Sequence, residues 1–318
     1  MSVETIGVDL GGTKMLVGAL AGTETRWESR EASTGQSQEE LVELLVREVG
    51  KAKAARPDVA AVGLGIPARI DRRRGLAIGA VNLPIAELPI RDLVAERVDL
   101  PVYVDNDANV AAYAEFLYGA GREATDMVML TIGTGIGGGL ILDGEIYRGG
   151  SGGGAELGHM VIDINGPPCQ GSCPGRGHIE SFASGTALGR EGMAAAESDP
   201  DSALATILAA EGTVDGKAVT EAAQAGDPTA KEIFELVGSR LGVALTSLAN
   251  IFDPQMFVFG GGVMAAGELL LAPARRELRE RALTPMNEAE VVPAELGADA
   301  GMIGAAAMAR TELEREAN

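Results

Sequence analysis

The chain has very little histidine and cysteine, with only two of each among 318 residues. All four lie close together, in the order His159, Cys169, Cys173 and His178. Two cysteines and two histidines are a common ligand set for tetrahedral zinc, and four protein ligands leave no position for a metal-bound water. The cluster therefore predicts a structural Zn²⁺ rather than a catalytic one.

Two other interpretations of this cluster remain open. Cys169 and Cys173 could form a disulfide, or the four residues could be free thiols and ordinary histidines. A disulfide across a Cys-x3-Cys spacing would be tight, and thiols stay reduced in the cytoplasm. The clustering and the ligand chemistry favour zinc.

The chain also lacks a long apolar run and an excess of basic residues. No apolar stretch approaches the length that spans a bilayer, and the first residues show no secretory signal, so we expect a cytoplasmic protein without membrane contact. The formal net charge of -20 disfavours nucleic acid as a partner. An anionic nucleotide would need local help from backbone N–H groups, helix ends or a metal.

Strand and helix patterns alternate along the chain, which predicts an α/β fold. The length is sufficient for two domains. The predicted strands cover residues 5–10, 15–20, 59–66, 102–104, 126–132, 138–142 and 256–259. The predicted helices cover residues 39–55, 108–119, 184–210, 217–225, 228–251 and 301–317, the last of them amphipathic.

A strand, a Gly/Thr turn and a returning strand occur near residue 9 and again near residue 131. Internal repetition of this kind predicts a duplicated protein with two domains and a cleft between them.

Three glycine-rich turns follow predicted strands, at residues 11–14, 133–138 and 260–265. The first does not fit a P-loop, and the second is followed by a strand where a dinucleotide fold needs a helix. The third is the better dinucleotide candidate, although no acidic residue follows at the expected distance. A nicotinamide dehydrogenase would leave the first two turns unexplained. Three turns at strand ends can direct many N–H groups at one polyphosphate.

The motifs together resemble the ROK family of bacterial sugar kinases and sugar-responsive repressors. The resemblance covers nearly the whole chain, and within the family the chain resembles the ATP-dependent glucokinases of actinobacteria. The segments that carry it are DLGGTK at 9–14, DNDAN at 105–109, TIGTGIGGG at 131–139, ELGH at 156–159, the cysteine loop ending at Glu180, and GGG at 260–262.

The resemblance implies a duplicated actin/hexokinase-like (ribonuclease H-like) fold that transfers the γ-phosphate of ATP to the 6-hydroxyl of glucose. Asp107 would be the general base, for which a simple helix N-cap is the structural alternative. The implied sugar-binding residues are Asn82, Asn106, Asp107, Glu156, His159 and Glu180. The implied residues for Mg²⁺ and nucleotide are Asp9, Gly11, Gly12, Thr13, Lys14, Gly133, Thr134, Gly135, Gly261 and Gly262.

From the same resemblance we expect one domain of residues 1–118 plus the helix 301–318. The second would be residues 119–300, with a zinc loop at 159–180. A homodimer or homotetramer is expected. Kinases for mannose, N-acetylmannosamine or fructose are alternatives. A non-catalytic sugar-binding regulator is disfavoured, because the acidic chain begins directly in the first strand, with no DNA-binding helix-turn-helix before it.

The chain departs from the family pattern at the metal loop, where the usual Cys-x-Cys-x4-Cys becomes Cys169-x3-Cys173-x4-His178. Histidine is an ordinary zinc ligand, so we expect a Cys2His2 site. The usual Gly-x-Pro-Gly turn is also altered, to Gly65-Ile-Pro-Ala68.

Overall fold

The chain forms two compact units in the computed structural model, which describes residues 3–33, 37–80, 83–171 and 173–317. The first unit contains the residues up to Glu123, Gly139–Ala155, and the residues from Glu295 onward. The second contains Ala124–Gly138 and Glu156–Ala294. The predicted α/β class with two domains is confirmed, while the predicted limits of those domains stay a prediction.

A five-stranded sheet forms the centre of the first unit, in the order β3-β2-β1-β4-β8. Its strands are β1 (Thr5–Leu10), β2 (Lys14–Ala21), β3 (Glu24–Ala32), β4 (Val62–Ile66) and β8 (Val102–Asn106). β1 runs antiparallel to β2 and parallel to β4, and β4 runs parallel to β8. The carboxyl ends of β1, β4 and β8 therefore meet at one edge of the sheet.

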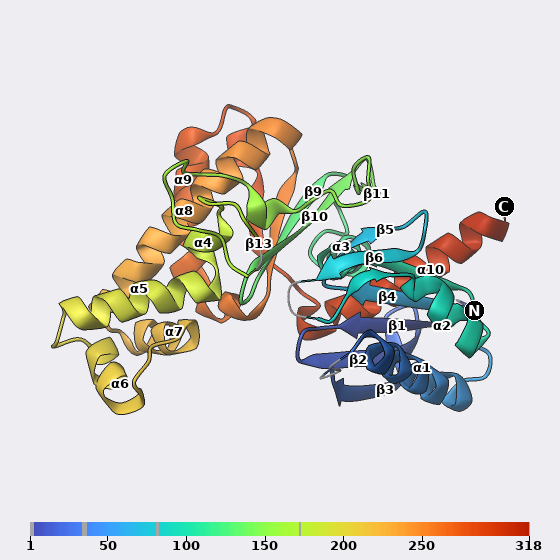
Figure 1. The fold of residues 1–318 in the computed structure, drawn as a ribbon. Coiled ribbons are helices and arrows are strands. Elements are labelled where there is room, and N and C mark those ends of the chain that lie inside the picture. Colours follow the sequence, from blue (N-terminus) through green and yellow to red (C-terminus); the bar gives the residue numbers. More distant parts are fainter. Residues whose placement is uncertain (1–2, 34–36, 81–82, 172, 318) are drawn as a thin grey trace. The chain divides into compact units, whose positions relative to one another are not determined.

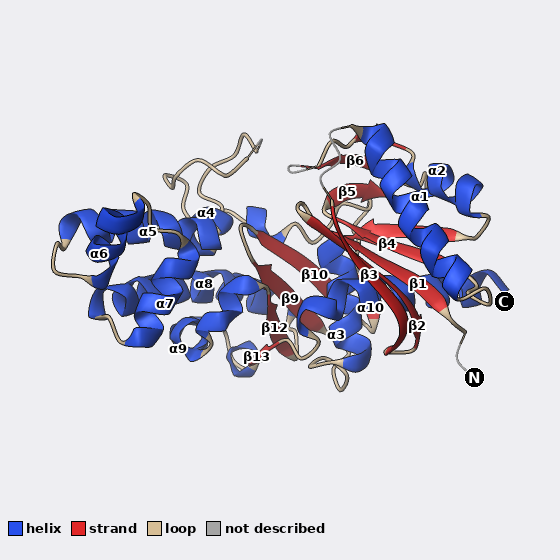
Figure 2. Cartoon of the chain, turned by 90° about the horizontal axis from the view of Figure 1, so that it is seen from below, coloured by secondary structure: helices blue, strands red, loops and turns tan. Residues whose placement is uncertain are grey.

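Helices cover both faces of this sheet (Figure 2). On one face lie α1 (Gln38–Ala55) and α2 (Ile90–Val98), and on the other lie α3 (Asp107–Tyr118) and α10 (Ala300–Ala317). Ser37 and Glu40 form a capping box that starts α1, as expected for a Ser-x-x-Glu sequence.

Close packing of α10 depends on glycines. An added Cβ would lie 2.0 Å from Met302 O at Gly7 and 1.7 Å from Val110 O at Gly304, so neither position has room for a side chain. The prediction that the helix 301–317 is amphipathic is wrong for residues 301–309, because the first ten residues of α10, 300–309, are all buried. They are enclosed because α10 packs against both the sheet and α3.

A second, smaller sheet in the first unit has the order β5-β6-β7. It is formed by β5 (Ala68–Asp71), β6 (Leu76–Ala80) and β7 (Ala86–Leu88). The sequence patterns did not predict these strands, because they are too short to show periodicity.

The other five-stranded sheet has the order β11-β10-β9-β12-β13. Its strands are β9 (Met127–Ile132), β10 (Ile136–Leu142), β11 (Glu145–Ile146), β12 (Met256–Gly260) and β13 (Glu290–Pro293). β12 runs parallel to both β9 and β13. The predicted repeat is confirmed, because β9 and β10 are joined by a glycine turn and are neighbours in their sheet, as β1 and β2 are.

Most of the second unit is helical (Figure 1). Its α-helices are α4 (Glu180–Ala183), α5 (Gly185–Ser198), α6 (Ala203–Glu211), α7 (Gly216–Ala225), α8 (Pro228–Phe252) and α9 (Glu268–Arg281). The short 3-10 helices of the chain are η1 (Leu157–His159), η2 (Gly262–Ala266), η3 (Met286–Glu288) and η4 (Gly297–Asp299). The helix predicted over 184–210 is divided into α5 and α6 around Pro200, which cannot continue a helix. Among the described residues, no helix is both long and apolar enough to cross a membrane.

Candidate functional site

Two carboxylates lie at the carboxyl edge of the first sheet. Asp9 is near the end of β1, and Asp107 begins α3 directly after β8. Gly65 on β4 is the register partner of Asp9. Burial, together with the negative charge of Asp107, raises the pKa of Asp9 to about 6, and Lys14 acts in the opposite direction. Two interacting carboxylates of this kind form a natural site for a cation.

The start of α10 leaves room for the Asp9 carboxylate. A Cβ added at Gly301 would lie 2.5 Å from Asp9 Cγ, so any side chain here would displace the carboxylate. Sequence analysis could not identify this role, because Gly301 is distant from Asp9 along the chain and belongs to no glycine-rich motif.

The first glycine turn is held by a residue from the end of β3. Gly11 N donates to Lys14 O at 2.8 Å, which closes the turn. The buried Ser33 donates from Oγ to Gly11 O at 2.6 Å and from its backbone N to Thr13 O at 3.1 Å. Ser33 was not among the predicted site residues. Ser33 holds the turn by donating hydrogen bonds to the carbonyl groups of Gly11 and Thr13.

Asn106 caps the helix that begins with Asp107. Its Oδ1 accepts from the backbone N of Ala108 at 2.9 Å and of Asn109 at 3.3 Å, and its Nδ2 donates to Ala68 O at 3.3 Å. The N-cap of α3 is therefore Asn106 and not Asp107, for which a capping role was the alternative. Asp107 is the first helical residue. The cap fixes the backbone that carries Asp107.

The buried carboxylate of Asp105 stabilises the same segment. Asp105 accepts from Arg148 Nε at 2.6 Å and from Asn109 Nδ2 at 2.9 Å, and Arg72 Nε lies 3.7 Å away. Asp105 also accepts from the backbone N of Asn106 at 2.8 Å. A fully buried charge requires such partners. Sequence analysis missed Arg148, because nothing local links it to the 105–109 motif.

The second and third glycine turns lie beside each other in the second unit. β9 and β12 are parallel neighbours, so the turns that follow them leave the same edge of the sheet. Gly261 has a φ of 89°, and an added Cβ would lie 2.4 Å from Ile132 O. Only glycine fits a position with this φ and this approach.

The amino end of α5 rests on the second turn. Gly133 N donates to Gly135 O at 2.9 Å within the turn, and Gly185 N donates to Gly133 O at 2.7 Å. Thr186 Oγ1 donates to Thr134 O at 2.9 Å. These bonds occupy carbonyl groups of the turn.

The cysteines and histidines of the 159–180 loop converge. One ligand atom from each of His159, Cys169, Cys173 and His178 lies within 4.8 Å of the others. The two histidine Nδ1 atoms are 3.2 Å apart, and the sulfur-to-Nδ1 distances are 3.6 Å for Cys169–His159 and 3.7 Å for Cys173–His178. Usual Zn–N and Zn–S bond lengths in a tetrahedron require about 3.3 Å and about 3.6 Å for these separations. The four side chains thus fit a zinc ion.

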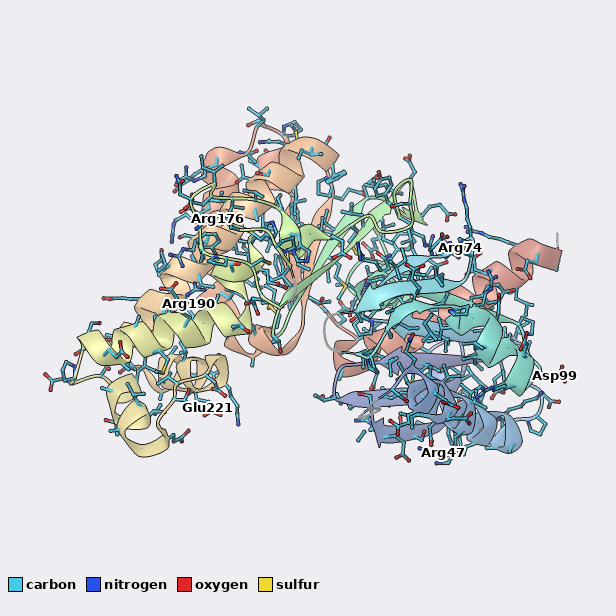
Figure 3. The ribbon with its side chains drawn as sticks, in the orientation of Figure 1. Arg47, Arg74, Asp99, Arg176, Arg190 and Glu221 are labelled. Atoms are coloured by element: carbon cyan, nitrogen blue, oxygen red, sulfur yellow. The ribbon has the colours of Figure 1, made fainter. Side chains whose placement is uncertain are left out.

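The two thiols are not joined in a disulfide, since both cysteines are free. Burial, followed by the proximity of Cys173, raises the pKa of Cys169 to about 11. A thiol in such surroundings becomes a thiolate when a cation replaces its proton. The loop is closed by Cys169 N donating to Gly175 O at 2.9 Å and by Arg176 Nε, labelled in Figure 3, donating to Gly166 O at 2.9 Å.

Glu180 joins this loop to the second glycine turn. Its Oε2 accepts from Ile136 N at 2.8 Å, and its Oε1 lies 3.7 Å from Cys169 Sγ. A Cβ at Gly135 would lie 2.1 Å from Glu180 Oε2. This contact between a predicted sugar-binding residue and a predicted phosphate-binding turn was not foreseen.

The predicted site residues divide between the two units. The first unit contains Asp9, Gly11, Gly12, Thr13, Lys14, Asn106 and Asp107. The second unit contains Gly133, Thr134, Gly135, Glu156, His159, Cys169, Cys173, His178, Glu180, Gly261 and Gly262. Glu156 directly precedes η1, whose last residue is His159. Asn82 lies outside the described residues.

The chain is similar to known proteins along nearly its full length. The chain matches the ROK family over residues 5–312. It is 35% identical to a glucokinase of Streptomyces coelicolor, with 96% of this chain and 97% of the relative covered. It is 31% identical to a putative xylose repressor of a Caldicellulosiruptor species, with 97% of this chain and 78% of the relative covered. A solved ROK family glucokinase from Streptomyces griseus, in complex with glucose and AMPPNP, has a TM-score of 0.84 and 37% identity, with 97% of this chain and 99% of that chain covered.

Proposed function

Because this chain belongs to the ROK family, we propose that it is an ATP-dependent hexose kinase that transfers the γ-phosphate of ATP to the 6-hydroxyl of glucose. The observation that carries the proposal is the pair Asp9 and Asp107 at one sheet edge, with the pKa of Asp9 raised by burial and by its neighbour's charge. Phosphoryl transfer needs a carboxylate to accept the hydroxyl proton and another to hold the metal of the nucleotide.

In this proposal the first unit supplies the charged groups. Asp107 accepts the proton of the sugar's 6-hydroxyl, and the cap made by Asn106 fixes its position. Asp9 would hold the Mg²⁺ that accompanies ATP. When bound, this cation neutralises phosphate charge and favours the ionised form of Asp9. Gly11, Gly12, Thr13 and Lys14 border the phosphates.

The second unit supplies neutral backbone donors. Carbonyl groups of Gly133 and Thr134 are already bonded to α5. We assign phosphate contacts to the turn residues Gly133, Thr134 and Gly135, with the N–H groups of Thr134 and Gly135 as the donors, because Gly133 N already donates to Gly135 O. We assign adenosine contacts to Gly261 and Gly262. The space around Gly133 and Gly262 supports this assignment, since a Cβ at either position would meet no atom within 4 Å.

Hexose recognition is assigned to Asn106, Glu156, His159 and Glu180, with Asn82 as a further candidate. His159 directs Nδ1 toward the other metal-ligating side chains, which leaves Nε2 for a sugar hydroxyl. Zn²⁺ held by His159, Cys169, Cys173 and His178 would have a structural role, because four protein ligands complete its coordination.

We also propose that the protein assembles as a homodimer or homotetramer. This proposal rests on the resemblance to the ROK family. Light scattering coupled to size exclusion measures the oligomeric state directly.

A panel of hexoses with ATP and Mg²⁺ tests the proposed function. We expect ADP formation that depends on hexose, with glucose preferred over mannose, fructose and N-acetylmannosamine. Glucose binding without ADP formation would instead identify a non-catalytic regulator, the other function found among the relatives. A hexose-dependent change in nicotinamide absorbance would support the dehydrogenase alternative.

A further inference from the structure

We propose that the 159–180 loop positions the phosphate-binding turn Gly133–Ile136, and that Gln170 is the positioning residue that transmits this effect. This inference rests on the proposed function, because it assigns the nucleotide to that turn. The loop would then set the affinity for nucleotide as well as for hexose. All the contacts that carry the inference lie within the second unit.

The first connection begins at Gln170, which follows the metal-ligating Cys169. Gln170 Nε2 donates to Ser184 Oγ at 2.8 Å and is 3.3 Å from Glu180 O. Ser184 is fully buried and caps α5, because its Oγ accepts from Ala187 N at 3.2 Å. Gln170 therefore stabilises the connection between α4 and α5 through the Ser184 hydroxyl, which caps α5.

The same end of α5 carries the turn. Gly185 N donates to Gly133 O at 2.7 Å, and Thr186 Oγ1 donates to Thr134 O at 2.9 Å. A Cβ at Gly185 would lie 2.8 Å from Gly133 O, so the helix end and the turn are in direct contact. A shift of the α5 start would move both carbonyl groups, and with them the N–H groups of the turn.

The second connection runs through Glu180 and does not involve α5. Glu180 Oε2 accepts from Ile136 N at 2.8 Å, and the same carboxylate has Cys169 Sγ at 3.7 Å from its Oε1. Gly135 has no room for a side chain, because its Cβ would lie 2.1 Å from Glu180 Oε2. The loop thus contacts the turn at both ends, at Gly133 through α5 and at Ile136 through Glu180.

Gln170→Ala tests the inference, because Gln170 is assigned no contact with sugar, nucleotide or metal. Calorimetry with AMPPNP and Mg²⁺, in the absence of hexose, should show a dissociation constant raised roughly 3- to 10-fold, the usual worth of one lost hydrogen bond. Zinc content by elemental analysis and the glucose dissociation constant should stay at wild-type values. Hydrogen exchange at Gly133–Ile136 should become faster.

Gln255→Ala is the matched control. Gln255 accepts from the backbone N of Thr125 at 2.6 Å and of Asp126 at 3.0 Å, at the opposite end of β9. This variant should bind AMPPNP like the wild type. Ser184→Ala removes the acceptor and also the cap of α5, so the double variant Gln170→Ala/Ser184→Ala should bind AMPPNP no more weakly than Ser184→Ala alone.

The outcomes separate this inference from the proposed function. Unchanged AMPPNP affinity and unchanged exchange at Gly133–Ile136 in folded Gln170→Ala would overturn the inference. So would additive effects of the two substitutions. A wild-type protein that binds no AMPPNP would contradict the proposed function, while the exchange measurement would still decide whether Gln170 holds the turn.

Discussion

The two strand–turn–strand repeats have the same topology but different surroundings. In the first, the turn after β1 lies beside the carboxylates Asp9 and Asp107, and one buried serine, Ser33, holds it. In the second, the turn after β9 is held by α5 and Glu180. The first repeat therefore has two carboxylates at its turn. The second has a turn that is held by a helix and by the loop with the four candidate metal ligands, and we propose that this turn offers backbone N–H groups.

This difference indicates how the two halves of a duplicated fold can contribute different chemical groups to one reaction. Clustered carboxylates are unfavourable without a cation, as the raised pKa of Asp9 shows. Backbone donors have no such conflict and instead need rigid support, since their positions decide what they bind. We expect substitutions in the first repeat to change chemistry and pH dependence, and substitutions in the second to change affinity.

The largest expected effect is that of Asp107→Asn. The amide preserves the shape of the side chain but cannot accept the hydroxyl proton, so turnover should fall by about 10²- to 10⁴-fold. Steady-state kinetics, together with glucose calorimetry, measure this. Glucose affinity should be largely kept, and near-normal turnover of a folded variant would remove Asp107 from its role.

Loss of one proposed metal ligand should lower glucose affinity, which the Asp107 substitution is expected to leave largely unchanged. Cys173→Ser should reduce zinc from one ion per chain to a small fraction, and glucose affinity should fall at least about 10-fold because the loop loses its fixed geometry. Nucleotide affinity should fall by a smaller factor through Gln170. Wild-type protein that contains no zinc, or a disulfide between Cys169 and Cys173 found by mass spectrometry of fresh lysate, would refute the assignment.

Gly304→Ala should destabilise the first unit strongly. Its Cβ would lie 1.7 Å from Val110 O, so α10 must move away from α3, at a cost of about 3 kcal/mol. Gly50→Ala is the matched control, because Gly50 lies in α1 and its Cβ would meet nothing within 4 Å. Denaturant unfolding should show a neutral or slightly stabilising effect for Gly50→Ala. Equal effects would contradict this packing.

Asp9→Asn should stabilise the protein in the absence of nucleotide and Mg²⁺. The folded pKa of Asp9, about 6, lies above its usual 3.8, so the folded state binds the proton more tightly. The stability that this tighter proton binding contributes is fully present below about pH 4 and is lost as the pH rises through about 6. At pH 7 the variant should gain on the order of 2–3 kcal/mol. Unfolding at pH 4 and pH 7 measures the difference, and a gain that is equal at both pH values would argue against titration of Asp9.

The sequence predicted those elements whose residues carry their own pattern. The strand Thr5–Leu10 is an uninterrupted, mostly apolar run, and its predicted limits are those of the structure. β3 was missed because ETRWESREA has no apolar alternation, and most of its residues are exposed on an edge strand. The convergence of the four candidate zinc ligands, His159, Cys169, Cys173 and His178, was predicted because they are close in sequence.

The supporting residues could not be predicted in the same way. Ser33, Arg148, Gln170 and Gly301 act through partners that are distant in sequence or on another element. Their residue types are ordinary for their segments, so only the folded chain reveals their roles. The capping role of Asn106 was open to prediction, since asparagine is a preferred N-cap residue.

The most direct test of the account is phosphorus NMR of the purified protein with glucose, ATP and Mg²⁺. We predict that ADP and a phosphate ester at the sugar's 6-position form in equal amounts, and that Asp107→Asn forms neither at a comparable rate. Glucose binding by a folded, zinc-loaded protein without any phosphate ester would contradict the account.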